Sequence, residues 1–255
     1  MRLKVSETLN VIKIAFVISI SDTKARYRRT VVGPFWIVIT TGLGVVGLGA
    51  VWSVLFGIDF NKMIQTLAVG LVFWGFIANT IIEATNVFTA NASVIMNYSL
   101  DKSFFVAKLI SRSIINFLHA SLVLIAVLVF YPPDTIHLFT FLCFFALVVI
   151  YLVSLTAIIG YISVRYRDLE HLINAIMPMV FLVTPVLYET NRFGVAGNIL
   201  YLNPIAIMIQ VVRSPLLGKQ LSHMELLIFF VGLTTSILLA LHVKRKYFKA
   251  LARWV

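Results

Sequence analysis

The sequence predicts an all-α integral membrane protein with six transmembrane helices. Three observations support this fold class. Of the 255 residues, 60% are hydrophobic and only 12% are charged, which lies outside the range of soluble domains. The apolar residues fall into separate segments, most of them long enough to cross the roughly 30 Å hydrocarbon core of a bilayer as a helix. Lysine and arginine gather in short runs at the ends of these segments.

Lipid offers no partner to an unpaired backbone N–H or C=O, so each apolar segment is expected to be helical. The fifth segment contains Pro178 and Pro185, and we expect it to be kinked or broken. The segment between the fifth and sixth spans is too interrupted for an ordinary span, and short re-entrant or interfacial helices fit it best. The six predicted spans cover residues 34–57, 67–90, 109–131, 138–163, 172–188 and 226–241.

The positions of the cations predict the topology. With both termini in the cytosol, all but four of the 21 lysines and arginines fall on the cytosolic side. The four exceptions are Lys62, Arg192, Arg213 and Lys219. We therefore expect a single transmembrane domain over residues 1–255. It comprises a cytosolic interface helix with a basic anchor (1–33), six spans (34–243) and a basic cytosolic tail (244–255).

The N-terminal segment is predicted to be an amphipathic helix that lies in the cytosolic membrane interface. Apolar residues recur there at helical spacing, while Lys13 and Lys24 fall elsewhere on the helical wheel. The segment lacks a small-residue cleavage pattern, so it is expected to be retained. The apolar positions are Val5, Leu9, Ile12, Phe16 and Ile20.

Glu83 is the one acidic residue that the sequence places deep in a predicted span, and such groups are functional candidates. It could pair with a polar neighbour such as Asn79 or Asn86, or line a wet conduit. Phe73, Trp74 and Tyr188 could stack against sugar rings in a channel, or serve as packing and interface residues. Candidate channel-lining residues are therefore Phe73, Trp74, Glu83 and Tyr188.

Several chemistries find no support in the sequence. Gly42, Gly44 and Gly47 spell G-x-G-x-x-G, but without the strand and acidic residue of a dinucleotide site, so we interpret them as a helix-packing surface. The chain contains no P-loop motif. His119 is expected to be packed or hydrogen-bonded, and no paired carboxylates, catalytic triad or metal cluster stands out. Nucleic-acid binding is disfavoured because the cations form no single face. We predict a non-enzymatic membrane protein without a metal or bound cofactor.

Three stretches carry a family resemblance that covers nearly the whole chain. They are RYRRTVVGPFWIVI, RYRDLEHLINAIMPMVFLVTPVLYE and YLNPIAIMIQVVRSPLLG. In this order they resemble the permease subunit of type-2 ABC exporters, in the branch that exports O antigen, teichoic acid or capsule. The resemblance implies a homodimer bound to two copies of a cytosolic P-loop ATPase, which would carry ATP and Mg²⁺. It also implies that a polyprenyl-pyrophosphate-linked polysaccharide, O antigen foremost, crosses the bacterial inner membrane between the subunits.

The resemblance also assigns roles to segments of this chain. The loop between the second and third spans would hold the coupling helix that contacts the ATPase, around Asn97, Tyr98, Asp101 and Lys102. Arg165, Arg167 and Asp168 would form a second ATPase contact, and residues 191–218 the external gate helices. The basic anchor suits a pyrophosphate headgroup, because arginine binds phosphate oxygens bidentately; alternatively it sets topology and touches anionic lipid. Its residues are Lys24, Arg26, Arg28 and Arg29.

Two other functions remain open from the sequence. A type-2 ABC exporter of a drug or small lipid would share the same spans and anchor. A membrane-embedded glycosyltransferase or phosphotransferase would instead need essential acidic loop residues. The candidates for that role are Asp59, Asp101, Asp134 and Asp168.

Overall fold

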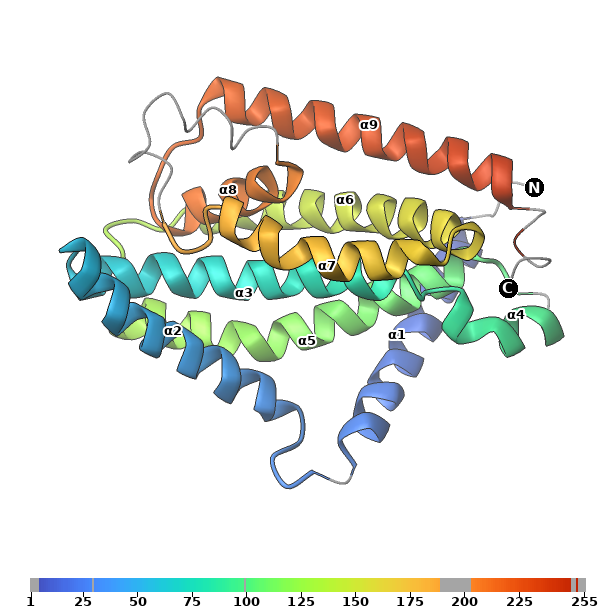
Figure 1. The fold of residues 1–255 in the computed structure, drawn as a ribbon, viewed down its shortest axis with the longest axis horizontal. Coiled ribbons are helices and arrows are strands. Elements are labelled where there is room, and N and C mark those ends of the chain that lie inside the picture. The colour runs from blue at the N-terminus through green and yellow to red at the C-terminus, as the bar shows by residue number, and fades with distance from the viewer. Residues whose placement is uncertain (1–4, 29, 99, 189–202, 249–250, 252–255) are drawn as a thin grey trace.

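The computed structural model describes residues 5–28, 30–98, 100–188, 203–248 and 251, with side chains from residue 10 onward. All the regular elements in this part of the chain are helices, as the sequence predicts. In chain order they are α1 (Val5–Tyr27), η1 (Gly33–Phe35), α2 (Trp36–Phe56), α3 (Phe60–Ala84), η2 (Thr89–Asn91), α4 (Ala92–Asn97), α5 (Ser103–Phe130), α6 (Leu138–Arg165), α7 (Asp168–Val183), α8 (Pro204–Leu216) and α9 (His223–Tyr247) (Figure 1).

Five helical segments are long and apolar enough to cross a membrane. They are Gly33–Phe56, which joins η1 and α2, and the helices α3, α5, α6 and α9. Each has 24 to 28 residues, or roughly 36–42 Å of helix, which exceeds the hydrocarbon core. In the fifth predicted span the structure has α7, whose 16 residues reach only about 24 Å. Five of the six predicted spans are therefore helices long enough to cross a membrane, and the fifth predicted span (172–188) stays a prediction.

Two of the spans begin at other residues than predicted. The second predicted span, 67–90, is the helix Phe60–Ala84, because Asp59 Oδ1 accepts hydrogen bonds from the backbone N–H groups of Asn61 (2.8 Å) and Lys62 (3.4 Å). The expected polar turn is thus mostly helical. At the third span, α5 begins at Ser103 rather than near residue 109. The fourth span begins at residue 138, as predicted.

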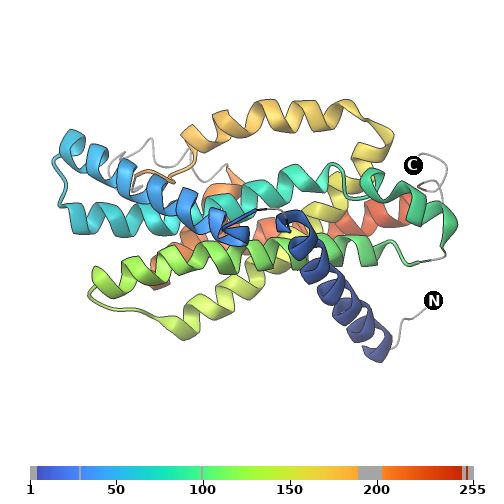
Figure 2. The same ribbon diagram turned by 90° about the horizontal axis from the view of Figure 1, so that it is seen from below.

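α3 is the central helix of the fold, and it contacts α2, α5, α6, α7 and α8. Figure 2 shows it between α5 on one side and α7 on the other. Phe73 and Phe76 of α3 meet Phe117 of α5 and Phe145 of α6, with ring centroids 4.9–6.3 Å apart. Aromatic packing of this kind adds to the burial of apolar area and fixes α3 against its neighbours.

The helices define two ends of the molecule. The α4 end carries α4, the start of α7 and the end of α9, and the α8 end carries α8 and the link between α2 and α3 (Figure 1). α3, α5, α6 and α9 run between these ends, and α7 runs from the α4 end toward the α8 end. α1 and α2 instead form an open V below the other helices. The loop between α6 and α7 and the end of α9, both with predicted cytosolic cations, therefore lie at the α4 end, whereas the link between α1 and α2 lies at the tip of the V.

Prolines shape the segment between α6 and α9. Pro178 lies inside α7, and α7 ends at Val183 because Thr184, which precedes Pro185, is held in an extended conformation (ψ 136°). α8 starts with Pro204 in its first turn, where a missing N–H costs nothing. The helix α8 supports the expected short helices over residues 204–216. The rest of the predicted gate region, up to residue 202, lies outside the described residues.

Candidate functional site

A polar cavity of about 310 Å³ lies where the end of α1 and the start of α2 approach α3 and α5. In a molecule built from apolar helices, polar side chains that converge on one cavity are candidates for substrate contact or ion conduction. Its polar lining comprises Arg26, Tyr27, Thr41, Asn79, Glu83, Ser113 and Asn116.

Glu83 joins three helices at this cavity. Its Oε2 accepts a hydrogen bond from Arg112 Nη2 of α5 at 2.6 Å, and its Oε1 lies 4.0 Å from Arg26 Nη1 of α1. Because α3 ends at Ala84, Glu83 lies in the last turn of its helix, which corrects the prediction that it is deep in a span. Its partner is an arginine rather than a neighbouring asparagine, since Asn86 donates to Glu170 Oε1 instead, at 2.5 Å.

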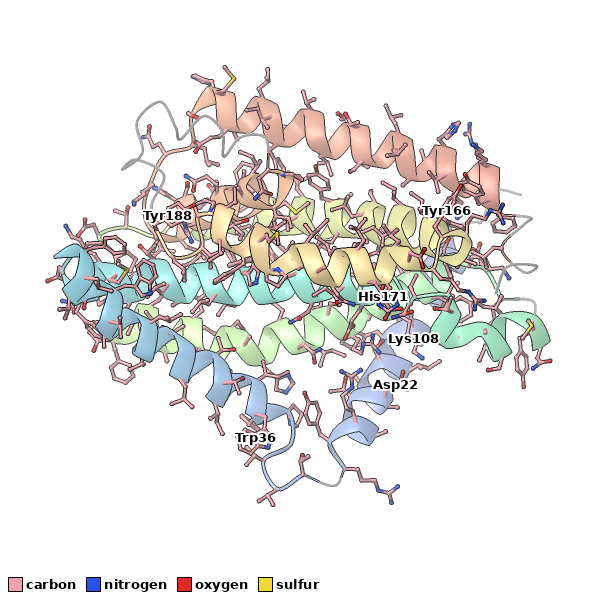
Figure 3. The ribbon with its side chains drawn as sticks, viewed as in Figure 1. Asp22, Trp36, Lys108, Tyr166, His171 and Tyr188 are labelled. Atoms are coloured by element: carbon pink, nitrogen blue, oxygen red, sulfur yellow. The ribbon has the colours of Figure 1, made fainter. Side chains whose placement is uncertain are left out.

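A second cavity, of about 420 Å³, lies on the other side of the same ion pair. Arg26, Lys108 and Arg112 all line it, against the single carboxylate of Glu83. Lys108 is itself paired with Asp22 of α1 at 2.8 Å, a contact that Figure 3 labels. The two cavities together therefore carry an excess of positive charge, which favours an anionic ligand.

The basic anchor lies only partly at this site. Arg26 lines both cavities, with half of its side chain exposed. Lys24 and Arg28 are exposed, and the structure gives neither a place in the cavity lining. Arg29 lies outside the described residues. Of the three anchor residues that the structure describes, Arg26 is the one that the fold brings to the other polar groups.

The predicted channel residues lie in three different places. Phe73 is fully buried in the aromatic core, which favours packing as its role. Trp74 borders an open groove of about 550 Å³ between α3 and α7, with its ring 5.1 Å from that of Phe181. Asn79 and Asn174 line the same groove. Tyr188 lies near the α8 end, where its hydroxyl donates to the Val183 carbonyl at 3.1 Å (Figure 3).

The two predicted ATPase contacts lie at the α4 end. Asn97 and Tyr98 are exposed at the end of the short helix α4, and Arg165, Arg167 and Asp168 are exposed in the turn between α6 and α7. Asp101 and Lys102 are half-buried, and Asp101 Oδ1 accepts a hydrogen bond from the Ser103 backbone N–H at 2.8 Å just as α5 begins. The fold thus brings both predicted contact segments to one end of the molecule.

Some residues of the site were not found from the sequence. Lys108 and Arg112 were counted only among the cytosolic cations that predict the topology, and Asn116 and Glu170 were given no site role. Glu83, Arg112 and Arg26 are far apart in sequence, and only the packing of α1, α3 and α5 joins them. A basic residue near the start of a span is compatible with either role, so the sequence carries no signal that separates them.

Other chemistries remain without support among the described residues. No group of three His, Cys, Asp or Glu side chains converges there on a metal site. His119 is hydrogen-bonded to the Ile115 carbonyl at 2.8 Å and stacks edge-on against Phe35, as expected for a packed histidine. Of the candidates for a transferase, Asp59 caps α3 and Asp101 accepts a hydrogen bond from the Ser103 backbone N–H.

Comparison with known proteins identifies the chain's family. Residues 15–217 match the ABC-2 type transporter family. Two proteins of Klebsiella pneumoniae, each named O-antigen export system permease protein RfbA, are 24% and 22% identical to this chain over 236 residues, covering 91% of each sequence. A protein of the same name from Myxococcus xanthus is 20% identical over 223 residues, covering 86% of both. The family match covers most of the chain and explains its apolar helices. This multi-pass membrane protein therefore belongs to the ABC-2 type transporter family, as a transport subunit that associates with an ABC ATPase.

Proposed function

We propose that this chain is the transmembrane subunit of an exporter that moves polyprenyl-pyrophosphate-linked O antigen across the bacterial inner membrane. It would act as a homodimer with two copies of a cytosolic P-loop ATPase, which binds ATP and Mg²⁺. The names of the relatives and their nearly full-length coverage support O antigen as the cargo. The absence of a P-loop motif in the sequence is in keeping with a separate ATPase.

The observation that carries the proposal is the pair of polar cavities around Glu83. A lipid-linked pyrophosphate brings several negative charges next to an apolar tail, and it needs a cationic site reachable from the membrane. Arg26 meets this requirement, because half of its side chain is exposed and its carboxylate contact is long, at 4.0 Å. Guanidinium groups bind phosphate oxygens bidentately. We assign Arg26 as the first contact of the headgroup, with Arg28 and Lys24 nearby in sequence.

The groove between α3 and α7 suits the glycan. Trp74 offers an aromatic face, and Asn79 and Asn174 offer amide donors and acceptors on the two facing helices. Sugar rings combine an apolar face with hydroxyl edges, and this lining matches both. In a homodimer, a second copy that covers the open side of this groove would turn it into a channel.

The proposed topology needs six crossings. α6 and α9 both run from the α8 end to the α4 end, so the chain must return between them. α7 runs in the required direction, and the segment after it leads to α8 at the other end. We propose that this stretch acts as the fifth span, with the α4 end and both termini in the cytosol.

The direct test is isolation of the transporter from its own bacterium in mild detergent. We expect the chain to co-purify with a P-loop ATPase, whose ATP turnover rises when lipid-linked O antigen is added. Deletion of the gene should abolish surface O antigen. If no ATPase is recovered and the deletion strain exports O antigen normally, the proposal is wrong. Stimulation by a drug or a small lipid instead would support the alternative exporter.

Arg26 and Arg28 separate headgroup binding from topology. Arg26→Gln removes the charge at the cavity, and we expect the concentration of lipid-linked glycan that half-stimulates the ATPase to rise at least fivefold. Arg28→Gln is the matched control outside the cavity lining, with an expected change of less than twofold. Both variants should insert normally, since most of the cytosolic cations remain. Equal effects of the two variants would contradict a specific role for Arg26.

A further inference from the structure

Arg213 on α8 is a buried cation, although the sequence placed it among the few external ones. Its residue is only 3% exposed. Nη1 donates to the carbonyl oxygens of Pro185 (2.5 Å) and Tyr188 (3.3 Å), and Nη2 donates to that of Val186 (3.1 Å). These carbonyls belong to the turn that follows α7, where the extended Thr184 ends the helical ladder. One guanidinium thus supplies hydrogen bonds to three carbonyls after the end of α7.

A second contact holds the start of α8 to the same turn. Asn203 Nδ2 donates to Thr184 Oγ1 at 2.8 Å, while Asn203 Oδ1 caps α8 through the backbone N–H of Ile205 at 2.9 Å. Thr184 is fully buried. α8 is therefore tied to the end of α7 near its first turn by Asn203 and near its last turn by Arg213.

Gly70 of α3 lies against the place where Arg213 meets the turn after α7. A Cβ atom at Gly70 would lie 2.2 Å from the Val186 carbonyl oxygen and 2.6 Å from Arg213 Nη2. No side chain fits there without displacing backbone, because the nearer atom belongs to the main chain. At Gly70, therefore, the turn after α7 and the Arg213 guanidinium rest directly on the backbone of α3.

We propose that Arg213 and Gly70 are positioning residues for transport. Arg213 joins the end of α7 and α8 into one rigid unit, called here the α7–α8 block (residues 180–188 and 203–216). Because Gly70 has no side chain, this block moves along the backbone of α3 there as the external side opens. α7 begins at the α4 end, next to the ATPase contacts, so motion there reaches α8 through the block rather than through α3. Two discrete elements that move as one body are a common way to transmit such motion.

Cross-linking tests the block. In a Cys143→Ser background, Thr184→Cys/Asn203→Cys places thiols at the hydrogen-bonded pair within the block. Ala78→Cys/Met177→Cys places them on α3 and α7, at two residues that line the groove between these helices and have no role in the proposed glycan contact. A short methanethiosulfonate cross-linker, which reductant cleaves, is applied to the complex with its ATPase. We expect the cross-link within the block to change export by less than twofold and the cross-link to α3 to lower it at least tenfold, with recovery on reduction.

Three outcomes of this experiment overturn the proposal. The first is a loss of export with the Thr184/Asn203 cross-link that reduction restores, because α8 would then have to leave α7. The second is full export with both cross-links, because the block would then not move along α3. The third is failure of the Thr184/Asn203 pair to cross-link in folded complex. Each comparison is made within one variant before and after reduction, so a failure of the proposed O-antigen cargo would appear instead as absent export in the reduced state.

Substitutions test the two residues individually. Gly70→Ala is expected to lower export at least fivefold, whereas Gly47→Ala, where an added Cβ would meet nothing within 4 Å, should change it less than twofold. Arg213→Met should uncouple the complex, so that ATP turnover continues while export falls at least fivefold. Arg213→Lys, which keeps three donors, should restore at least half of the export. A parallel loss of ATP turnover, export and folded complex in Arg213→Met, without rescue by lysine, would reduce Arg213 to a stability role and contradict the proposal.

Discussion

At the scale of single residues, the carboxylate of Glu83 lies between the guanidinium groups of Arg112 and Arg26. The coupling free energy between Glu83 and Arg112 can be measured directly. Glu83→Gln removes the charge from a hydrogen bond of 2.6 Å and leaves the arginine without its counter-ion. Both side chains are about three-quarters buried, so we expect a coupling free energy near the middle of the range of about 0.5–3 kcal/mol for contacting residues. Thermal unfolding of Glu83→Gln, Arg112→Gln and the double variant measures it.

The Asp22–Lys108 pair is the matched control for that cycle. It joins α1 to α5 at 2.8 Å, but Asp22 is 41% exposed, so solvent screens the attraction. The same cycle with Asp22→Asn and Lys108→Gln should give a coupling of less than about 1 kcal/mol. A coupling free energy at Glu83 no larger than that of the control pair would show that the Glu83–Arg112 ion pair does not stabilise the site.

The glycines show how far single residues could be interpreted from the sequence. The G-x-G-x-x-G run on α2 was predicted to be a close-packing surface, yet Gly42 and Gly44 make only ordinary contacts and Gly47 faces open space. Gly49 does pack on α3, against Phe60 and Ile64. Close approaches occur instead at Gly70 and Gly160, which stand alone in the sequence. At both positions, atoms of segments distant in the sequence occupy the space that a Cβ would need. The local sequence carries no pattern that indicates this.

At the scale of elements, α1 shows which part of an amphipathic helix contacts protein. Ala15, Ser19 and Thr23 are buried against α5, and Ser19 Oγ donates to the Lys108 carbonyl at 2.8 Å. The predicted apolar positions Ile12 and Phe16 are exposed, as expected for residues that face lipid. The sequence thus predicted the helix, and its membrane face stays a prediction. It did not indicate the face of small residues, because small side chains carry almost no hydrophobic signal.

The small-residue face makes the docking of α1 testable. Ser19→Leu places a larger side chain where α1 and α5 touch, and we expect α1 to lift away from α5. Trypsin cleavage after Lys24 and Arg26 should then be at least fivefold faster in the purified complex. Phe16→Leu on the exposed face is the control and should leave the cleavage rate unchanged. Equal rates in both variants would show that the small-residue face does not hold α1.

α9 begins at a capping box, and this gives a separate prediction. Ser222 Oγ accepts from the Glu225 backbone N–H at 3.2 Å, and Glu225 Oε2 accepts from the Ser222 backbone N–H at 2.7 Å. Ser222→Ala should destabilise the protein by about 1 kcal/mol, which is about 2–4 °C in apparent melting temperature. Ser222→Thr keeps the cap and serves as the control. An unchanged melting temperature in Ser222→Ala would show that the start of α9 does not limit stability.

At the scale of the whole molecule, hydropathy predicted the spans, because the membrane determines them. The candidate site and the exact ends of the helices depend on packing and on local caps. Five apolar segments appear as spans because lipid forces their backbones into helices. The candidate site depends on the meeting of α1, α2, α3 and α5, so of its charged residues only Arg26 and Glu83 were predicted. α7 ends at Val183 rather than at residue 188, because the extended Thr184 before Pro185 stops the helix. The ends of spans moved because caps such as Asp59 act locally, whereas hydropathy averages over many residues.

The number of crossings between α6 and α9 decides the topology of the whole protein. α6 ends at the α4 end and α9 begins at the α8 end. If the segment from α7 to α8 crosses the membrane, Tyr166 and Gln220 lie on opposite sides; if α7 only enters and turns back, they lie on the same side. The cations Arg165 and Arg167 beside Tyr166 favour a cytosolic location for that turn.

In a Cys143→Ser background, we expect Gln220→Cys to react with a membrane-impermeant maleimide in intact spheroplasts, and Tyr166→Cys to react only after permeabilisation. Both positions are exposed in the structure, so access within the fold does not limit either reaction. Labelling of both residues from the same side would replace six crossings by five and would put the basic tail after α9 outside the cell, against the positive-inside rule.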